Sequence, residues 1–511
     1  MSPVASVVAV VLVSIVSLAV GAFGLRPSRT MGDFYVASRG VGPLLNASAI
    51  SGEYLSAASF LGVAGLILVR GVDMLWLPVG WTAGYLLLLV FVAAPLRRSG
   101  AYTLPDFAQL RLESLNVRRA SSVLVVAIGM LYLAPQFRGA GLTLRTLTGA
   151  EPWVGQVVAA IVVGLSVLPG GMRSVTLVQA FHYWLKLAAL LTPVFFLLAA
   201  VSSGRSKAPR GRLDLAEWAE PLTGEHALFL TYSLVLATFL GAMGLPHVVV
   251  RFYTNRDGRA ARRTTLVVLL LLAGFYLLPI TYGVLGRVFA LDLVDAGRAD
   301  SVVLELPSRL LAGPLAEALT ALLAAGAFAA FLSTSTGLVV SIAGVLSQDL
   351  ITWGSEHRQV ISAFRLSTVL AVTLAVIMTT ASARLPVAHA VELAFAVAAS
   401  TFCPMLLLGI WWRGLTAVGV MSGLAVGGSL SMSAVLATTF GISGEGWVGA
   451  VLLQPAALTV PAAFVTMVIG SLLTRSRRPQ HVAQTMVRLH APEHLSLNRG
   501  PFNPERDTAR R

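Results

Sequence analysis

The feature that most constrains this chain is the repetition of apolar runs about 20 residues long. A helix of about 20 apolar residues is long enough to cross the hydrocarbon core of a bilayer. The composition agrees, because 56% of the residues are hydrophobic and 12% are charged, against about 25% charged in soluble proteins. The sequence therefore predicts an all-α, multi-pass protein of the cell membrane (the inner or plasma membrane).

The apolar runs predict about thirteen transmembrane helices. Their approximate bounds are 4–23, 44–69, 74–95, 121–147, 153–168, 175–201, 228–250, 265–289, 315–346, 360–381, 387–411, 416–440 and 452–473. A short helix at the membrane interface is expected over 301–311. The polar, basic tail 474–511 contains four prolines and is expected to be disordered.

The net charge of +14 is explained by membrane orientation rather than by nucleic-acid binding. Arginines follow the odd-numbered helices, which places those loops in the cytoplasm, the N-terminus outside and the C-terminus inside. The loop with Arg205, Lys207, Arg210 and Arg212 is an exception, because it falls on the outer side. Cys403 is the single cysteine, so no disulfide framework is expected.

The second apolar run contains residues that a simple membrane span does not need. The stretch Ser51–Gly62 holds the acid Glu53, the hydroxyls of Ser56 and Ser59, and two glycines. An intramembrane acid is a functional-site hypothesis, and loosened backbone is tolerated only inside protein or beside a water-filled cavity. This pattern predicts a broken helix at the centre of a transporter.

A second break is predicted five helices later, at Gly241, Gly244 and Pro246, while His247 is interpreted as structural. Interrupted segments at matching positions of two halves indicate an inverted repeat with its site at the midplane. The expected divisions are a first helix and loop (1–43), repeat 1 (44–201), an extracellular loop (202–226), repeat 2 (227–411), two further helices (412–473) and a cytoplasmic tail (474–511).

Helix 315–346 carries a candidate cation site. Ala330 and Ser333 are one turn apart, with Thr334 beside them. Two hydroxyls together with carbonyls freed at a helix break are oxygen ligands of the kind that hard cations prefer. Alternatively, these hydroxyls only bond to the carbonyls of their own helix.

Three of the basic residues inside predicted helices are candidates for function. Arg138 requires a partner, which is either Glu53 or an anionic substrate. His182 and Lys186 share one helix face, so at least one of them is neutral or Lys186 reaches a polar cavity. A further possibility is that the Lys186 ammonium replaces a cation in the site.

Several motifs spread over the first nine helices resemble those of the sodium:solute symporter family, in its acetate and monocarboxylate branch. They are Gly32-Asp-Phe-Tyr-Val-Ala-Ser-Arg39, the Ser51–Gly62 stretch, Tyr102-Thr-Leu-Pro-Asp-Phe107, Gly170-Gly-Met-Arg173, Gly244-Leu-Pro-His-Val-Val-Val-Arg-Phe252 and Ser347-Gln-Asp-Leu350.

This resemblance implies a LeuT-like 5+5 inverted repeat, alternating access and a sodium gradient as the driving force. It implies that sodium binds the carbonyls of Gly52, Leu55 and Ala330 and the hydroxyls of Ser333 and Thr334. Gln179 stands where some members have an acid, so one sodium ion is expected rather than two.

The expected function is sodium-coupled uptake of a small carboxylate such as acetate or pyruvate. The substrate is expected near Ser56, Ser59, Arg138, Gly241 and Gly244, with Glu53, Gln179 and Lys186 as coupling or gating residues.

No enzyme signature, nucleic-acid partner or cofactor beyond the coupling ion is expected, and the oligomeric state is left open, a monomer included. The alternatives are a proton-coupled carrier that uses Lys186 or Glu53, a non-transporting nutrient sensor, and an ion channel.

Overall fold

The computed structural model describes residues 3–24, 36–169, 171–204, 225–351, 357–381, 387–442, 444–493 and 495. Four predicted features lie wholly or partly outside these residues. They are residues 32–35 of the motif that begins at Gly32, Gly170 of the motif Gly170-Gly-Met-Arg173, most of the loop 202–226 with its four basic residues, and the tail beyond residue 495.

The described chain is built from helices, and its β-structure is a single isolated bridge between Val41 and Asn255. The main helices are α1 (Pro3–Phe23), α3 (Pro43–Tyr54), α4 (Val63–Arg70), α5 (Trp76–Leu87), α6 (Ala93–Ser99), α7 (Leu104–Leu112), α8 (Leu115–Thr148), α9 (Pro152–Val167), α10 (Met172–Ser202), α12 (Ala227–Gly244), α13 (Pro246–Val250), α14 (Gly258–Phe289), α15 (Asp292–Asp295), α16 (Val302–Leu310), α17 (Gly313–Val345), α18 (His357–Ala381), α19 (Val387–Trp411), α20 (Ala417–Thr439), α21 (Gly446–Leu453), α22 (Ala456–Leu473) and α23 (Val482–His490).

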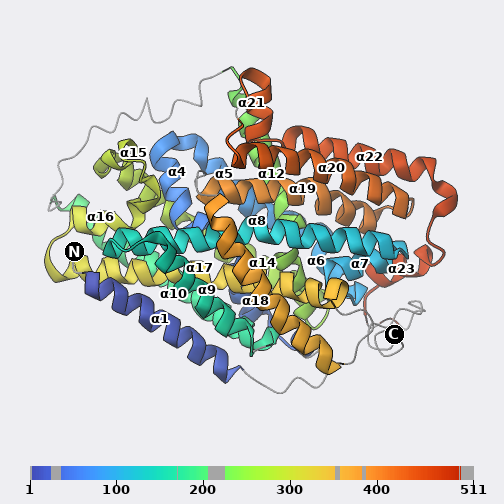
Figure 1. The fold of residues 1–511 in the computed structure, drawn as a ribbon, viewed down its shortest axis with the longest axis horizontal. Coiled ribbons are helices and arrows are strands. Elements are labelled where there is room, and N and C mark those ends of the chain that lie inside the picture. The colour runs from blue at the N-terminus through green and yellow to red at the C-terminus, as the bar shows by residue number, and fades with distance from the viewer. Residues whose placement is uncertain are drawn as a thin grey trace.

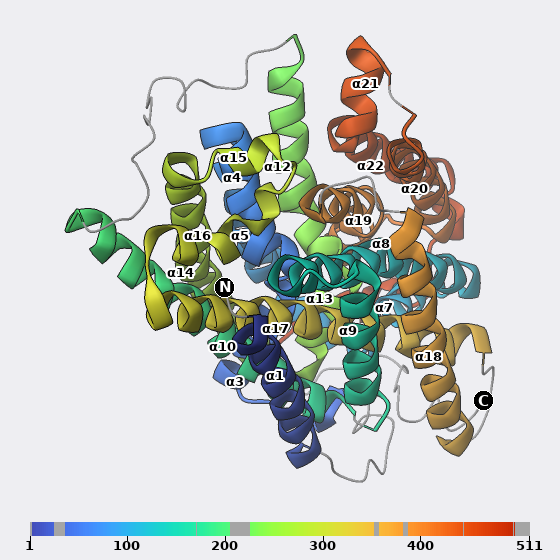
Figure 2. The same cartoon turned by 60° about the vertical axis from the view of Figure 1, so that its left-hand side comes forward.

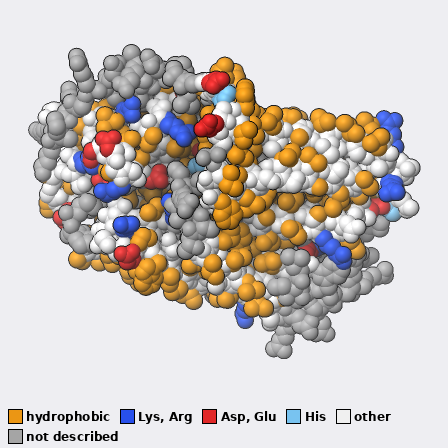
Figure 3. Space-filling view, turned by 45° about the horizontal axis from the view of Figure 1, so that its top comes forward, with side chains coloured by type: hydrophobic (Ala, Val, Ile, Leu, Met, Phe, Trp, Pro, Cys, Tyr) orange, Lys and Arg blue, Asp and Glu red, His pale blue; other side chains and the backbone are white. Residues whose placement is uncertain are grey.

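Eleven apolar helical segments within the described residues are long enough to cross a membrane, and α9 is a shorter apolar helix. The molecule is therefore a multi-pass membrane protein, while thirteen spans and the absolute orientation stay predictions. Figure 3 shows a broad belt of hydrophobic side chains, with charged side chains mostly toward the two ends of the long axis. Exposed Val8, Leu12 and Ile15 on α1 are typical of a surface that faces lipid.

Helix α17 forms the centre of the bundle. It packs against α10, α8 and α1, and α10 in turn packs against α3 (Figures 1 and 2). Its sequence suits this place, because the stretch from Leu323 to Val339 is buried throughout and rich in alanine, serine and threonine. Small residues allow neighbouring helices to approach closely in a membrane.

Both predicted breaks are present. Helix α3 ends at Tyr54, Leu55 leaves the helical conformation with φ −75° and ψ 86°, and the chain resumes as the π-helix η2 (Ala58–Gly62) followed by α4. Helix α12 ends at Gly244, Leu245 is extended with ψ 116°, and α13 begins at Pro246. Proline suits this second restart, because the first position of a helix needs no backbone N–H.

The prediction of a disordered tail is wrong for residues 482–490, which form the amphipathic helix α23. Its Met486 and Leu489 are buried, and α23 packs against α6 and α7. The Arg98 Nη1 atom donates a hydrogen bond of 3.1 Å to the His490 carbonyl. Prolines and arginines dominate the composition around this segment and conceal its short apolar stripe. Helix α23 lies at the end of the molecule opposite the start of α1 (Figure 1).

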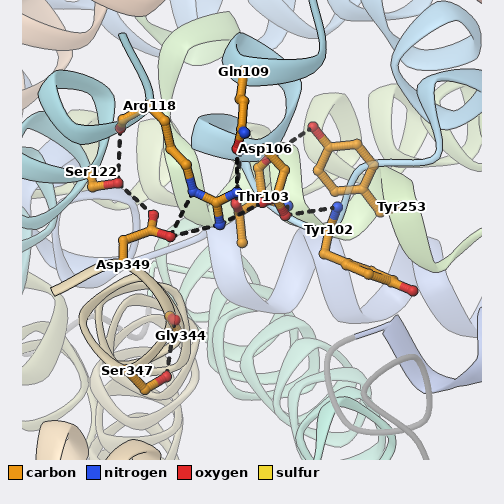
Figure 4. Close-up of polar contacts among 10 residues, drawn as sticks. All are labelled: Tyr102, Thr103, Asp106, Gln109, Arg118, Ser122, Tyr253, Gly344, Ser347 and Asp349. Carbon is orange, nitrogen blue, oxygen red and sulfur yellow. Dashed lines mark hydrogen bonds and ion pairs between the residues drawn. The ribbon is translucent and has the colours of Figure 1, made fainter. Parts of the chain in front are cut away.

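Two of the sequence motifs meet in one ion network at that same end (Figure 4). Arg118, at the start of α8, contacts Asp106 of α7 at 2.9 Å and Asp349 at 2.6 Å. Asp349 follows α17 and also accepts a 2.5 Å hydrogen bond from Ser122. Asp106 completes a capping box with Thr103 at the start of α7. The network therefore fixes the end of α17 to α7 and α8.

Close helix contact at the first break gives a test of this packing. A Cβ atom added at Gly52 would lie 2.0 Å from the backbone oxygen of Gln179, whereas one added at Gly274 on α14 would meet nothing within 4 Å. We expect Gly52→Ala to lower the free energy of unfolding by about 1–3 kcal/mol or more through overpacking. Thermal unfolding of the purified protein in detergent, with Gly274→Ala as the control, checks this. Equal stability of the two variants would contradict the close approach of α3 and α10.

Candidate functional site

The site forms where α10 and α17 face the first break. The ammonium of Lys186, on α10, donates hydrogen bonds to the carbonyl oxygens of Gly52 at 2.5 Å and Leu55 at 2.6 Å. It also donates to the Ser333 hydroxyl on α17 at 3.0 Å. Lys186 is fully buried. Three of the five predicted sodium ligands are therefore bound to a side chain of the chain itself.

The two other predicted sodium ligands lie beside these three. The Thr334 hydroxyl donates a 2.6 Å hydrogen bond to the Glu53 carbonyl, and the Ala330 carbonyl accepts one of 3.1 Å from Ser333. The structure thus brings all five predicted ligands together, although sodium binding by them stays a prediction. A sodium ion does not fit between the Gly52, Leu55 and Ser333 oxygens while the ammonium is in place.

The carboxylate of Glu53 forms a buried ion pair with Arg251, with 2.6 Å between Oε2 and Nε. Arg251 begins the 3-10 helix η5 (Arg251–Thr254) directly after α13. The Arg251 guanidinium also donates to Thr176 and Gln179 of α10, and the Gln179 amide nitrogen donates to the Ser333 carbonyl at 3.0 Å. Gly337 leaves room for Glu53, because a Cβ atom there would lie 2.0 Å from Oε1.

Of the two partners considered for Arg138, Glu53 is paired with Arg251. Arg138 instead interacts electrostatically with Asp300, in the short 3-10 helix η6 (Ala299–Ser301) between α15 and α16. Burial raises the pKa of Asp300, and the positive charge of Arg138 opposes that shift. A substrate contact of Arg138 stays a prediction.

Two predicted substrate residues lie in the break. The Ser59 hydroxyl lies 3.0 Å from the Tyr276 hydroxyl, and the Ser56 hydroxyl accepts a 3.2 Å hydrogen bond from the Ala58 N–H. The Ala57 N–H, freed at the break, donates to the Gln136 side chain of α8 at 3.1 Å. Both serines are buried.

The glycines of the second break serve close packing. A Cβ atom at Gly241 would lie 2.4 Å from the Phe395 carbonyl oxygen, and one at Gly244 would lie 2.3 Å from that of Ala398. Both carbonyls belong to α19. The structure thus places these glycines against α19, and a role in substrate binding stays a prediction for them.

An aromatic cluster lies between the two breaks, and Phe395 is its centre. The Phe395 ring is 5.7 Å from Trp81, 6.1 Å from Tyr54 and 6.0 Å from Tyr132, and Tyr132 is 5.2 Å from the His247 ring. Tyr85 lies 4.8 Å from Tyr54. The cluster therefore joins helices α3, α5, α8, α13 and α19.

Three members of this cluster have buried polar atoms without a hydrogen-bond partner among the described residues. These atoms are the Trp81 indole nitrogen, the Tyr85 hydroxyl oxygen and both ring nitrogens of His247. A buried polar group without a partner is costly, so each such group in a native structure calls for an explanation. A small polar solute would provide one.

Sequence reasoning missed Arg251, Trp81, Tyr85 and His247. In the sequence Arg251 is one of several arginines that follow helix 228–250, and its place five residues after Pro246 is the available signal. His247 was interpreted as structural. Trp81 and Tyr85 are four residues apart on α5 and so share one helix face, but an aromatic pair in an apolar helix does not stand out from lipid-facing residues.

Comparison of the sequence with known proteins gives three findings. The model of the sodium:solute symporter family matches residues 34–427. An uncharacterized symporter, YwcA, of Bacillus subtilis is 28% identical over 93% of this chain and 95% of its own length. A monocarboxylic acid transporter of Corynebacterium glutamicum is 28% identical over 89% of this chain and 88% of its own.

The fold also matches a solved structure, a substrate-bound outward-open state of a Na+-coupled sialic acid symporter. The TM-score is 0.69 at 14% identity, and the match covers 91% of this chain and 98% of the other. At this identity the match shows a shared fold.

The Glu53–Arg251 pair gives a prediction on stability. Glu53→Gln leaves the Arg251 guanidinium buried without its counter-charge, which typically costs about 3–5 kcal/mol. The control is Asp292→Asn, because Asp292 is 64% exposed in its pair with Arg309 and surface pairs contribute about 1 kcal/mol or less. Thermal unfolding in detergent should therefore show a large loss for Glu53→Gln and a small one for Asp292→Asn. Similar losses of stability in the two variants would contradict a stabilising role of the buried Glu53–Arg251 pair.

Proposed function

Because the chain belongs to the sodium:solute symporter family, we propose that it imports a small carboxylate, coupled to a cation gradient, by alternating access. The relative named as a monocarboxylic acid transporter supports a short monocarboxylate such as acetate or pyruvate as the substrate. Sodium is the coupling ion that the name of the family implies.

The observation that carries this proposal is the group of buried polar atoms in the aromatic cluster that have no hydrogen-bond partner among the described residues. The Trp81 indole and the Tyr85 hydroxyl each offer a donor, and His247 offers at least one more. A carboxylate accepts such hydrogen bonds, and the aromatic rings around it suit the short apolar part of a monocarboxylate. The proposed contacts of the carboxylate are therefore Trp81, Tyr85 and His247, together with the predicted Ser56 and Ser59.

A second candidate keeps the substrate and changes the coupling ion. The Lys186 ammonium on three of the predicted sodium ligands favours a proton-coupled carrier. The two candidates differ only in the gradient that drives uptake, so one experiment separates them.

That experiment is uptake of labelled acetate and pyruvate into liposomes that contain the purified protein. An inward sodium gradient, an inward proton gradient and no gradient are compared. Uptake that requires sodium supports the first candidate, and uptake that follows protons alone supports the second. Saturable binding of the carboxylate without flux under any gradient would contradict transport and favour the sensor.

The proposed substrate contacts predict selective losses of affinity. Tyr85→Phe and Trp81→Phe each remove one hydrogen bond to a charged group, worth about 1.5–3 kcal/mol, which corresponds to a KM increase of about tenfold or more. Tyr232→Phe is the control, because Tyr232 is 69% exposed on α12. Concentration dependence of uptake, with thermal unfolding measured in parallel, checks this. An unchanged KM in both variants would contradict binding of the carboxylate by these side chains.

A further inference from the structure

The Lys186 ammonium has as many acceptors as it has hydrogens. An ammonium group carries three N–H donors, and the Gly52 carbonyl, the Leu55 carbonyl and the Ser333 hydroxyl accept one each. The ammonium is therefore fully satisfied by oxygen atoms, which is a condition for a stable buried charge. Two of these oxygens come from the break after α3 and one comes from α17.

These oxygens belong to uncharged groups. Glu53 is the nearby acid, but its carboxylate is bound to the guanidinium of Arg251 at 2.6 Å. The His182 ring, one turn before Lys186, is bound through Nε2 to Ser17 of α1 at 2.7 Å. The ammonium thus has the surroundings that a hard monovalent cation prefers, namely several neutral oxygens.

The position of Lys186 is fixed by tight helix packing on both sides. Seven residues before it, the Gln179 carbonyl of α10 leaves no room for a side chain at Gly52. Three residues after it, Ala189 lies so close to Gly326 of α17 that a Cβ atom there would be 2.4 Å from the Ala189 Cβ. Since α10 is held against both α3 and α17, the ammonium has little freedom to leave the oxygens while the helices stay in place.

We propose that the Lys186 ammonium is the resident cation of this site and that the site therefore binds no sodium ion. Any sodium that the protein uses then binds elsewhere. This proposal deepens the proposed function, because it concerns the cation site of the same transporter, yet it can be tested without any substrate. It also predicts that shortening Lys186 creates a sodium site.

The experiment compares thermal unfolding of the purified full-length protein, without substrate, in sodium chloride and in N-methyl-D-glucamine chloride of equal ionic strength. Any sodium-specific shift of the wild type should be unchanged by Ser333→Ala, because no sodium ion binds at Ser333 while the ammonium is in place. Lys186→Ala frees two carbonyls and a hydroxyl, and sodium binding there should raise its Tm by about 1–3 °C more than the Tm of the wild type. Adding Ser333→Ala to Lys186→Ala should remove that gain. Leu191→Ala, a truncation at an exposed position of α10, is the control and should behave as the wild type.

A direct measurement keeps the proposal falsifiable if Lys186→Ala does not fold. Equilibrium binding of sodium-22 to the wild type should be unaffected by Ser333→Ala, and saturable binding that Ser333→Ala abolishes would overturn the proposal. A folded Lys186→Ala protein without any response to sodium would also overturn it, since the oxygens would then not form a cation site. Failure of acetate or pyruvate uptake would change neither result.

Discussion

The carbonyl oxygens freed at the first helix break are the constraint on which the rest of the site depends. Where α3 ends, the carbonyls of Gly52, Glu53 and Leu55 lose their helical partners inside an apolar bundle, where unsatisfied backbone costs several kcal/mol. Lys186 satisfies two of them and Thr334 the third. The side chains that satisfy these carbonyls, Lys186 on α10 and Thr334 on α17, therefore hold both helices against the break.

The two breaks are also joined to each other. Arg251 follows the second break, and its guanidinium reaches Glu53, one residue before the end of α3. Through Gln179 the same guanidinium connects to the Ser333 carbonyl beside the ammonium. A change in the tilt of either broken helix must therefore move or break this ion pair. The pair thus couples the positions of the two breaks.

Much of the fold could be predicted from the sequence, because hydrophobic periodicity and glycine or proline positions are local signals. Helix 387–411 has the bounds expected, and both breaks fall where predicted. The pairing of Glu53 could not be predicted in this way, since sequence spacing says nothing about which of several arginines folds back into the bundle. The five oxygens predicted as sodium ligands were implied by the family resemblance. That Lys186 reaches three of them depends on helix packing, which the sequence does not show.

A cation that is covalently part of the chain changes the meaning of occupancy at this site. A free ion fills its site to an extent set by its concentration in the medium, but the Lys186 side chain is always present at one per molecule. Its effective concentration depends only on the geometry that holds α10 against the break. Emptying the site is then an intramolecular event, a displacement of one helix from another, and no dilution of the surrounding solution can bring it about.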